Sequence, residues 1–248
     1  MPRRCNLPAE HLDRRLTLAA AIFDVDGVLV ASPHERAWRE TLPSFADPSR
    51  FTTAMYQEYV AGRPGLSGAR AALEQLGVPD AIRQAVVYAQ RKQQRLEQLI
   101  AAGSFAAFPD AIRFVEAVES LGMRMAVASS SKNADQMMEL IRVGSGRSLL
   151  EVFSANVCGR DLRQGKPSPE IFLLAAAELG MAPARCFVIE DAPVGIRAAR
   201  AGGTTALGVA RQHDVAMLQA EGADLVVRSL DEIAIGELAN GRLCRREV

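Results

Sequence analysis

The chain of 248 residues is long enough for one large domain, or for a core with a smaller domain attached. Its 29 basic and 29 acidic residues balance, so it lacks the broad positive field that non-specific nucleic-acid binding requires. A hydrophobic content of 49% excludes the intrinsically disordered class.

The cysteine pattern and the N-terminal sequence bear on the compartment. The four cysteines form no C-x-x-C pair, which argues against a zinc ribbon or a disulfide framework and suits a reducing compartment. The first apolar run, over 16–23, is too short to span a bilayer, and charged residues over 10–15 interrupt any signal peptide. We therefore expect a cytoplasmic protein with no membrane partner.

The first predicted element is a strand at Leu18–Phe23. From about Pro33 to Gly103 the sequence then shows helical periodicity broken by prolines and glycines, with no strand pattern. A single crossover between parallel strands needs far fewer residues. We predict an inserted all-helical cap over 31–102, with its longest helix near Asp80–Ala102, and a core formed by 1–30 and 103–248.

After the cap, apolar runs alternate with helical patterns, which predicts parallel strands joined by crossover helices. Helices are expected at Asp110–Leu121, Ala134–Val143, Pro169–Leu179, Val194–Ala201 and Val215–Gly222. Strands are expected at Met123–Ala128, Ala155–Cys158, Cys186–Ile189, Thr205–Val209 and Leu225–Val227. Their continuous apolar character is typical of strands buried on both faces. The predicted fold class is α/β, a Rossmann-like parallel-sheet core, and the polar segments 1–16 and 240–248 are expected to be solvated extensions.

Four polar clusters fall at or just after the carboxyl ends of predicted strands, where open parallel sheets bind ligands. Taken singly, each could be a turn, a helix cap or a helix start. Together they bring several charged groups to one sheet edge, which requires a ligand or a metal to offset their desolvation. The clusters are Asp24 with Asp26, the run from Ser129 to Asn133, Lys166, and Glu190 with Asp191.

The residue types in these clusters suit phosphoryl chemistry. Mg²⁺ typically takes one or two carboxylates together with phosphate oxygens and water. A metal and a lysine would neutralise a phosphoryl group, so that Asp24 could attack it. Asp26 lies two residues on, and the turn at Gly27 can bring its carboxylate to the same site, where it would act as general acid and then general base.

The segments FDVDGVL, VASSS, GKPSPEIF and VIEDAPVGI occur in this order around the predicted cap. They resemble the haloacid dehalogenase superfamily of phosphotransferases, over nearly the whole chain from Ala19 to about Leu230. An aspartate nucleophile with all its Mg²⁺ partners present favours phosphate esters over dehalogenation.

The resemblance assigns roles to the core motifs. Asp24 is implied as the nucleophile that forms an aspartyl phosphate and as a Mg²⁺ ligand. Asp26 is implied as the general acid and base, and as the donor of a main-chain carbonyl to the metal. Ser129 and Lys166 would hold the transferring phosphoryl group. Asp191 would complete the metal shell, and Glu190 would be either a further ligand or its support.

Within the superfamily the chain is most similar to the β-phosphoglucomutase-like branch. The sequence His34-Glu35-Arg36-Ala37-Trp38 resembles the H-x-x-A-W element of that branch, in which the histidine helps position the acid/base aspartate. Arg91-Lys92-Gln93 resembles an R-K-N element whose lysine contacts the sugar. The implied substrate-binding residues are His34, Trp38, Lys92, Ser130, Ser131, Lys132 and Asn133, although Trp38 also suits a core position in the cap.

One departure from the mutase pattern affects the predicted reaction. Gly65 stands where mutases keep an arginine for the distal phosphate, and Arg63 or Arg70 would have to replace it. A mutase must hold a bisphosphate in both orientations, so this departure favours hydrolysis of a small phosphomonoester, expected to be a sugar phosphate. The alternative is a mutase that converts β-glucose 1-phosphate to glucose 6-phosphate, and a remote alternative is a non-catalytic binding protein of the same fold. A monomer that binds a small phosphorylated metabolite, and no nucleic acid, is the default expectation.

Overall fold

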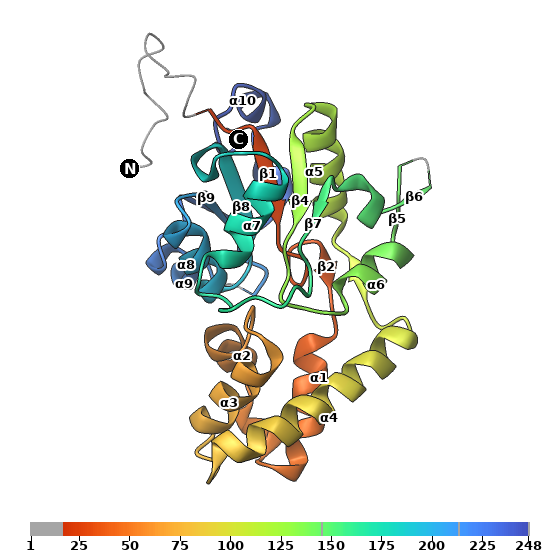
Figure 1. Cartoon of the computed structure of the whole chain (residues 1–248), viewed down its shortest axis with the longest axis vertical. Coiled ribbons are helices and arrows are strands. Elements are labelled where there is room, and N and C mark those ends of the chain that lie inside the picture. The colour runs from red at the N-terminus through yellow and green to blue at the C-terminus, as the bar shows by residue number, and fades with distance from the viewer. Residues whose placement is uncertain (1–16, 145, 213, 248) are drawn as a thin grey trace.

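A six-stranded parallel sheet lies at the centre of the computed structural model, which describes residues 17–144, 146–212 and 214–247. The strand order is β10-β9-β8-β1-β4-β7, which places β1 in the middle of the sheet (Figure 1). All six predicted strands are present, with bounds β1 (Ala20–Phe23), β4 (Arg124–Val127), β7 (Ala155–Asn156), β8 (Cys186–Glu190), β9 (Thr205–Val209) and β10 (Leu225–Val227).

Helices cover both faces of this sheet. Ala21 and Phe23 of β1 belong to the apolar layer that includes α5 (Pro109–Ser120) and α6 (Ala134–Leu140). Ala20 and Ile22 belong to the opposite layer, which holds side chains of α7 (Glu170–Glu178), α8 (Pro193–Ala201) and α9 (Val215–Ala220). The last helix of the core is α10 (Ile235–Ala239). Because successive residues of a strand face opposite layers, the unbroken apolar runs follow directly, and the predicted fold class is confirmed.

Residues 32–105 hold no strand and form a second lobe beyond the carboxyl ends of the sheet, drawn orange to yellow in Figure 1. Its helices are α1 (His34–Thr41), α2 (Thr53–Tyr59), α3 (Gly65–Gln75) and α4 (Ala81–Ala101), with short 3₁₀ turns at Leu42–Ser44 and Pro48–Arg50. This helical cap has a hydrophobic cluster of its own, centred on Trp38, Phe51, Leu73 and Tyr88. No helix in the described part of the chain is long and apolar enough to cross a membrane.

The chain passes between core and cap through a small antiparallel ribbon that the sequence did not indicate. It consists of β2 (Val30–Ala31) and β3 (Ala106–Ala107). Phe108 N then donates a hydrogen bond to Leu29 O at 3.0 Å, which extends the pairing by one residue. Strands of two residues are too short for hydrophobic periodicity to reveal. The exact cap boundaries at 31 and 102 stay a prediction.

Two local predictions were wrong. The helix expected to reach Val143 ends at Leu140, because Ile141 adopts an extended backbone. The following strand β5 (Arg142–Val143) pairs with β6 (Arg147–Ser148) in a short hairpin.

The C-terminal segment is also not a free extension. Leu18 N donates to Gly241 O at 3.1 Å, and Ala234 N donates to Cys244 O at 2.9 Å. Arg242 Nε binds Glu237 at 2.7 Å. These contacts fix the segment against the core, whereas the expected extension over 1–16 lies outside the described residues.

Candidate active site

The carboxyl ends of β1, β4 and β8 open into a cavity of about 940 Å³ that both the core and the cap line. In the sheet register, Phe23 of β1 lies beside Val127 of β4 and Ile189 of β8. The residues that follow these positions therefore emerge side by side. This register explains how motifs more than 160 residues apart in the sequence meet at one place.

Lys166 lies between two carboxylates at the base of this site. Its Nζ is 2.7 Å from Asp24 Oδ1 and also donates to Glu190 Oε1. The ammonium lies over the ring of Phe172, 5.1 Å from its centroid. Although burial opposes the charged form, the carboxylates of Asp24 and Glu190 raise the pKa of Lys166. Lys166 is therefore a fixed positive charge beside Asp24.

The acidic side of the site carries more charge than Lys166 can balance. Burial raises the pKa of Asp24 to about 8 although Lys166 opposes this, and the charge of Glu190 adds to the rise. Burial, followed by the charges of Glu190 and Asp24, raises the pKa of Asp191 well above its usual range. A bound cation would favour the ionised form of both aspartates.

The arrangement of these carboxylates fits a hard divalent cation. Oxygen atoms of Asp24, Glu190 and Asp191 lie within 4.8 Å of one another, and all three residues are buried. Glu190 Oε2 already accepts from the backbone N–H groups of Asp191 and Ala192 at 3.1 Å each, and its other oxygen holds Lys166. Glu190 is thus placed to orient its neighbours, whereas Asp24 and Asp191 are placed to supply ligand oxygens.

Two glycines make room for these carboxylates. Gly27 has φ +81°, and a Cβ built on it would lie 1.9 Å from Asp191 Oδ2. A Cβ on Gly195 of α8 would lie 2.0 Å from the Glu190 carboxylate. At both positions any side chain would displace an acidic group from the site.

The turn at Gly27 places the Asp26 carboxylate on the cap side of the site, outside the three-carboxylate cluster. Ser129 Oγ donates to Asp26 Oδ2 at 3.3 Å, and His34 Nε2 lies 3.5 Å from Asp26 Oδ1. Asp26 Oδ1 is buried, and no described residue makes a hydrogen bond to it. Apart from the long approach of His34 Nε2, this buried oxygen has no partner among the described residues, so it is available to a ligand in the cavity.

His34 connects Asp26 to the cap. Burial lowers the pKa of His34 to about 4, so its imidazole is neutral at pH 7. Lys92 Nζ lies 3.0 Å from His34 Nδ1, and since an ammonium can only donate, Nδ1 accepts and Nε2 carries the proton. That proton faces Asp26 and also Ser131 Oγ, which is 3.3 Å away.

Lys92 and Trp38 pack together on the cap side of the cavity. Lys92 is 4% exposed, and its ammonium lies 4.9 Å from the centroid of the Trp38 ring. Trp38 is buried against Tyr88 with ring centroids 5.0 Å apart, so it is a core residue of the cap that also lines the cavity.

The segment between β4 and α6 is held by its own serine side chains and also contacts the helical cap, whereas none of its side chains caps the N-terminus of α6. Ser131 N donates to Ser129 Oγ at 3.1 Å, and Asn133 N donates to Ser131 Oγ at 3.2 Å. Ser130 Oγ donates to Gly62 O at 3.4 Å. In addition, Gln93 Nε2 of α4 donates to Asn133 Oδ1 at 3.2 Å. Lys132 differs from these residues, because its side chain is 73% exposed and makes a long ion pair of 3.4 Å with Asp161 at the cavity edge.

Arg63 and Arg70, the two arginines that could replace the mutase arginine missing at Gly65, lie in different environments. Arg70 forms an exposed ion pair with Glu74 on α3 and does not line the cavity. Arg63 does line the cavity, and its Nε is buried with no hydrogen-bond partner among the described residues. Burial lowers the pKa of Arg63, and the nearby charge of Arg197 lowers it further.

Sequence reasoning did not single out several residues that line this cavity, among them Arg211, Tyr56 and Gln57. Arg211 follows the carboxyl end of β9, so the strand-end rule that found the other motifs could have found it. Gln57 of α2, which is buried, and Tyr56 of the same helix, which is half-buried, also line the cavity. Nothing in their local sequence distinguishes them from ordinary core residues of the cap.

A family model for haloacid dehalogenase-like hydrolases matches residues 18–203. The chain belongs to this family. The haloacid dehalogenase-like protein is 31% identical over 239 residues to a β-phosphoglucomutase of Mycobacterium bovis, across 86% of this chain and 90% of the relative. It is 28% identical over 227 residues to hexitol phosphatase A of Escherichia coli, across 89% of this chain and 95% of the relative.

A solved structure extends the similarity of this haloacid dehalogenase-like enzyme to three dimensions. The archaeal β-phosphoglucomutase of a hyperthermophilic Pyrococcus matches with a TM-score of 0.70 at 32% identity, over 88% of this chain and 96% of that chain. The chain is therefore a phosphotransferase-type enzyme of the haloacid dehalogenase superfamily, in the β-phosphoglucomutase-like branch.

Proposed function

We propose that this enzyme hydrolyses a small phosphomonoester, a sugar phosphate, through a phosphoryl group carried on Asp24. The observation that supports this most directly is the placement of Asp24. One of its oxygens is held 2.7 Å from the Lys166 ammonium at the base of a cavity that Asp26, Ser129 and Asp191 also line. A carboxylate fixed beside a buried positive charge and facing open space suits nucleophilic attack on phosphorus.

Two displacements at phosphorus account for the reaction. In the first, an Asp24 oxygen forms a bond to phosphorus while the ester P–O bond breaks, and Asp26 gives a proton to the departing alkoxide. In the second, Asp26 removes a proton from water, which attacks the same phosphorus and releases inorganic phosphate and free Asp24. In both steps the Lys166 ammonium neutralises charge on the phosphoryl oxygens, and the hydroxyl of Ser129 donates a hydrogen bond to them. The neutral His34, with Nε2–H facing Asp26, orients that carboxylate.

The proposed cofactor is Mg²⁺, held by Asp24, Asp191 and the main-chain carbonyl of Asp26, with Glu190 as support or as a further ligand. The metal would supply positive charge to a phosphoryl group that already faces buried carboxylates. The fit rests on the cluster of acidic oxygens within 4.8 Å and on the burial of all three residues.

Substitution of Gly27 by alanine is expected to weaken Mg²⁺ binding and to lower turnover by about a hundredfold, because the new Cβ would collide with Asp191. Gly77→Ala is the matched control, since Gly77 also has a positive φ, of +71°, but a Cβ there meets nothing within 4 Å. Both variants carry backbone strain, so the comparison shows what strain alone does to the fold, and Mg²⁺ affinity reports the displacement of Asp191. Calorimetric titration with Mg²⁺ and an assay of phosphate release measure the difference, and equal behaviour of the two variants would contradict the assignment of Asp191.

Lys92 provides a prediction about pH. Burial lowers the pKa of Lys92 to about 8, so the ammonium loses its charge as the pH rises through that value. If Lys92 binds an anionic sugar phosphate, KM is expected to rise above pH 8 more than kcat falls. Lys92→Met should raise KM about tenfold at pH 7 and abolish its further rise with pH. Steady-state assays between pH 6 and 9 test this, and an equal rise of KM in both proteins would remove Lys92 from the binding site.

A hexose-phosphate mutase is the second candidate, and one observation favours it. Arg63 lines the cavity and keeps a buried Nε without a partner among the described residues, so it is placed to bind a second anionic group. Hydrolase and mutase share every core residue proposed above and differ in the acceptor of the phosphoryl group. The named relatives include both kinds of enzyme.

Phosphorus NMR of the protein with Mg²⁺ and β-glucose 1-phosphate, primed with a trace of glucose 1,6-bisphosphate, distinguishes these two reactions. Growth of inorganic phosphate alone supports the hydrolase. Growth of a glucose 6-phosphate signal supports the mutase and overturns the hydrolase as the main activity. A panel of other sugar phosphates follows if neither signal grows, and failure of every phosphate ester would refute phosphoryl transfer.

A further inference from the structure

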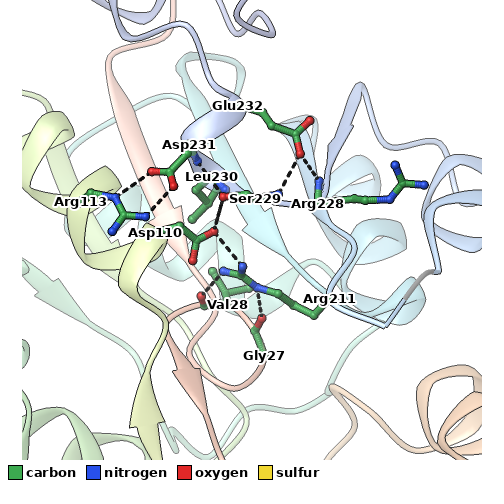
Figure 2. Close-up of polar contacts among 10 residues, drawn as sticks. All are labelled: Gly27, Val28, Asp110, Arg113, Arg211, Arg228, Ser229, Leu230, Asp231 and Glu232. Atoms are coloured by element: carbon green, nitrogen blue, oxygen red, sulfur yellow. Dashed lines mark hydrogen bonds and ion pairs between the residues drawn. The ribbon is translucent and has the colours of Figure 1, made fainter.

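Arg211, which follows β9 and lines the cavity, contacts the loop after β1 (Figure 2). Its Nε donates to Gly27 O at 3.3 Å, and its Nη2 donates to Val28 O at 3.2 Å. The guanidinium also stacks on Phe108, with Cζ 4.0 Å from the ring centroid. Since Phe108 directly follows β3, the Arg211 side chain contacts both the loop after β1 and the segment by which the chain returns from the cap.

Asp110 fixes the guanidinium in this position. Asp110 Oδ2 accepts hydrogen bonds from Arg211 Nη1 at 2.8 Å, from Leu230 N at 2.8 Å and from Ser229 Oγ at 3.0 Å (Figure 2). The side chains of Arg211 and Asp110 are only 12% and 9% exposed. A largely buried pair with several additional hydrogen bonds is rigid, and so it suits a support more than a contact that breaks on ligand binding.

The loop that Arg211 holds is otherwise closed mostly upon itself. Gly27 N donates to Val30 O, and both Leu29 N and Val30 N donate to Val25 O, each at 2.9 Å. Internal hydrogen bonds keep the shape of a loop, but they do not place it relative to the sheet. Arg211, two residues beyond the end of β9, supplies two hydrogen bonds from outside the loop, one to Gly27 O directly after Asp26 and one to Val28 O.

We propose that Arg211 is a positioning residue for phosphoryl transfer, which acts through the Gly27 and Val28 carbonyls to hold Asp26 in place and to keep the cap ribbon in register with it. This proposal rests on the proposed function, because it assigns a purpose to the position of Asp26. Arginine suits the role since its planar, forked guanidinium can bind two carbonyls and one carboxylate while it stacks on a ring. Lysine has no such plane.

A neighbouring ion pair provides a control for a merely structural role. Arg113 Nε donates to Asp231 Oδ1 at 3.0 Å, and this pair links α5 to the turn at Leu230–Glu232 without touching the loop (Figure 2). Arg113→Gln therefore removes an arginine–carboxylate pair from the same region. It leaves the contacts of Gly27 and Val28 in place.

The test compares Arg211→Gln, Arg211→Lys and Arg113→Gln with the wild-type enzyme. Single-turnover rates are measured on β-glucose 1-phosphate, whose leaving oxygen needs a proton, and on p-nitrophenyl phosphate, whose leaving oxygen does not. If Arg211 positions Asp26, Arg211→Gln should lose about a hundredfold on the sugar phosphate and much less on the aryl phosphate. Arg211→Lys keeps the positive charge and replaces Arg211→Gln in the test if that variant does not fold. It should also lose more rate on the sugar phosphate than on the aryl phosphate, but the loss should be smaller. Arg113→Gln should match the wild type on both.

Equal losses on the two substrates, or Arg211 variants that match Arg113→Gln, would overturn the proposal. Hydrogen exchange of the peptide over residues 24–31 gives a readout that does not depend on turnover, and it should accelerate in the Arg211 variants only. If the wild type turned over neither substrate nor any other phosphate ester, the proposed function would fail instead. The exchange data would then decide by themselves whether Arg211 holds the loop, and unchanged exchange would end the proposal.

Discussion

Substitution of Asp24 by asparagine is expected to lower turnover by about a thousandfold or more while the protein stays folded. An amide has nearly the shape of the carboxylate but cannot attack phosphorus, so the chemical step is lost. The fold should tolerate the change, because burial raises the pKa of Asp24 to about 8 and an amide has no charge to bury. Lys166 would still be held by Glu190.

Phosphate release together with intact-protein mass spectrometry measures this effect. The wild type, quenched in acid during turnover, should carry a covalent phosphoryl group that the Asp24→Asn variant lacks. Asp231→Asn is the matched control, since Asp231 is an exposed carboxylate paired with Arg113 and does not line the cavity. Retention of a phosphoryl adduct in the Asp24→Asn protein would place the nucleophile elsewhere.

Substitution of Lys166 by glutamine is expected to abolish activity and to lower the free energy of unfolding by about 3–5 kcal/mol at pH 8. The lysine is fully enclosed between Asp24 and Glu190, so its removal leaves two buried carboxylates without a counter-charge. Arg200→Gln, which breaks an exposed ion pair with Asp224, should cost about 1 kcal/mol or less.

The loss of unfolding free energy in Lys166→Gln should become smaller as the pH falls, because the buried carboxyl groups then become protonated. A carboxyl whose pKa is higher in the folded than in the unfolded chain stabilises the fold at low pH and loses that contribution as the pH rises through its folded value. Burial raises the pKa of Asp24 and of Asp191 in this way, and loss of Lys166 would raise both further. Urea unfolding at pH 5 and pH 8 in the presence of a chelator measures the effect. A loss of unfolding free energy that does not change with pH would show that the charges of the buried carboxylates are not its cause.

Much of this site could be predicted because its residues follow a local rule. Asp24 directly follows β1, Ser129 lies two residues beyond the end of β4, and Glu190 is the last residue of β8. The parallel register of these three strands brings those positions together. The order of the motifs and the length of the inserted segment were also visible in the sequence. The fold class could be predicted because successive residues of each strand are buried in opposite layers, which gives continuous apolar runs in the sequence.

The features that could not be predicted depend on contacts between distant parts of the chain. Arg211 binds Gly27 across 184 positions, and His34 meets Lys92 across 58. Each strand of the β2–β3 ribbon is only two residues long. The helix α6 ends at Leu140 because the backbone becomes extended at Ile141, and no glycine or proline there indicates this end in the sequence. Single-sequence periodicity contains no information about such pairings.

The ribbon formed by β2 and β3 has a thermodynamic consequence. Asp26 lies on the loop that leads directly into this ribbon, and the cavity that receives the substrate is lined by both lobes that the ribbon connects. Placement of Asp26 and occupancy of the cavity are then linked equilibria, so each must change the other by the same coupling free energy. A variant that displaces the loop should therefore weaken substrate binding by a certain factor. Bound substrate should shift the equilibrium of the loop toward its ordered position by the same factor, and both effects can be measured.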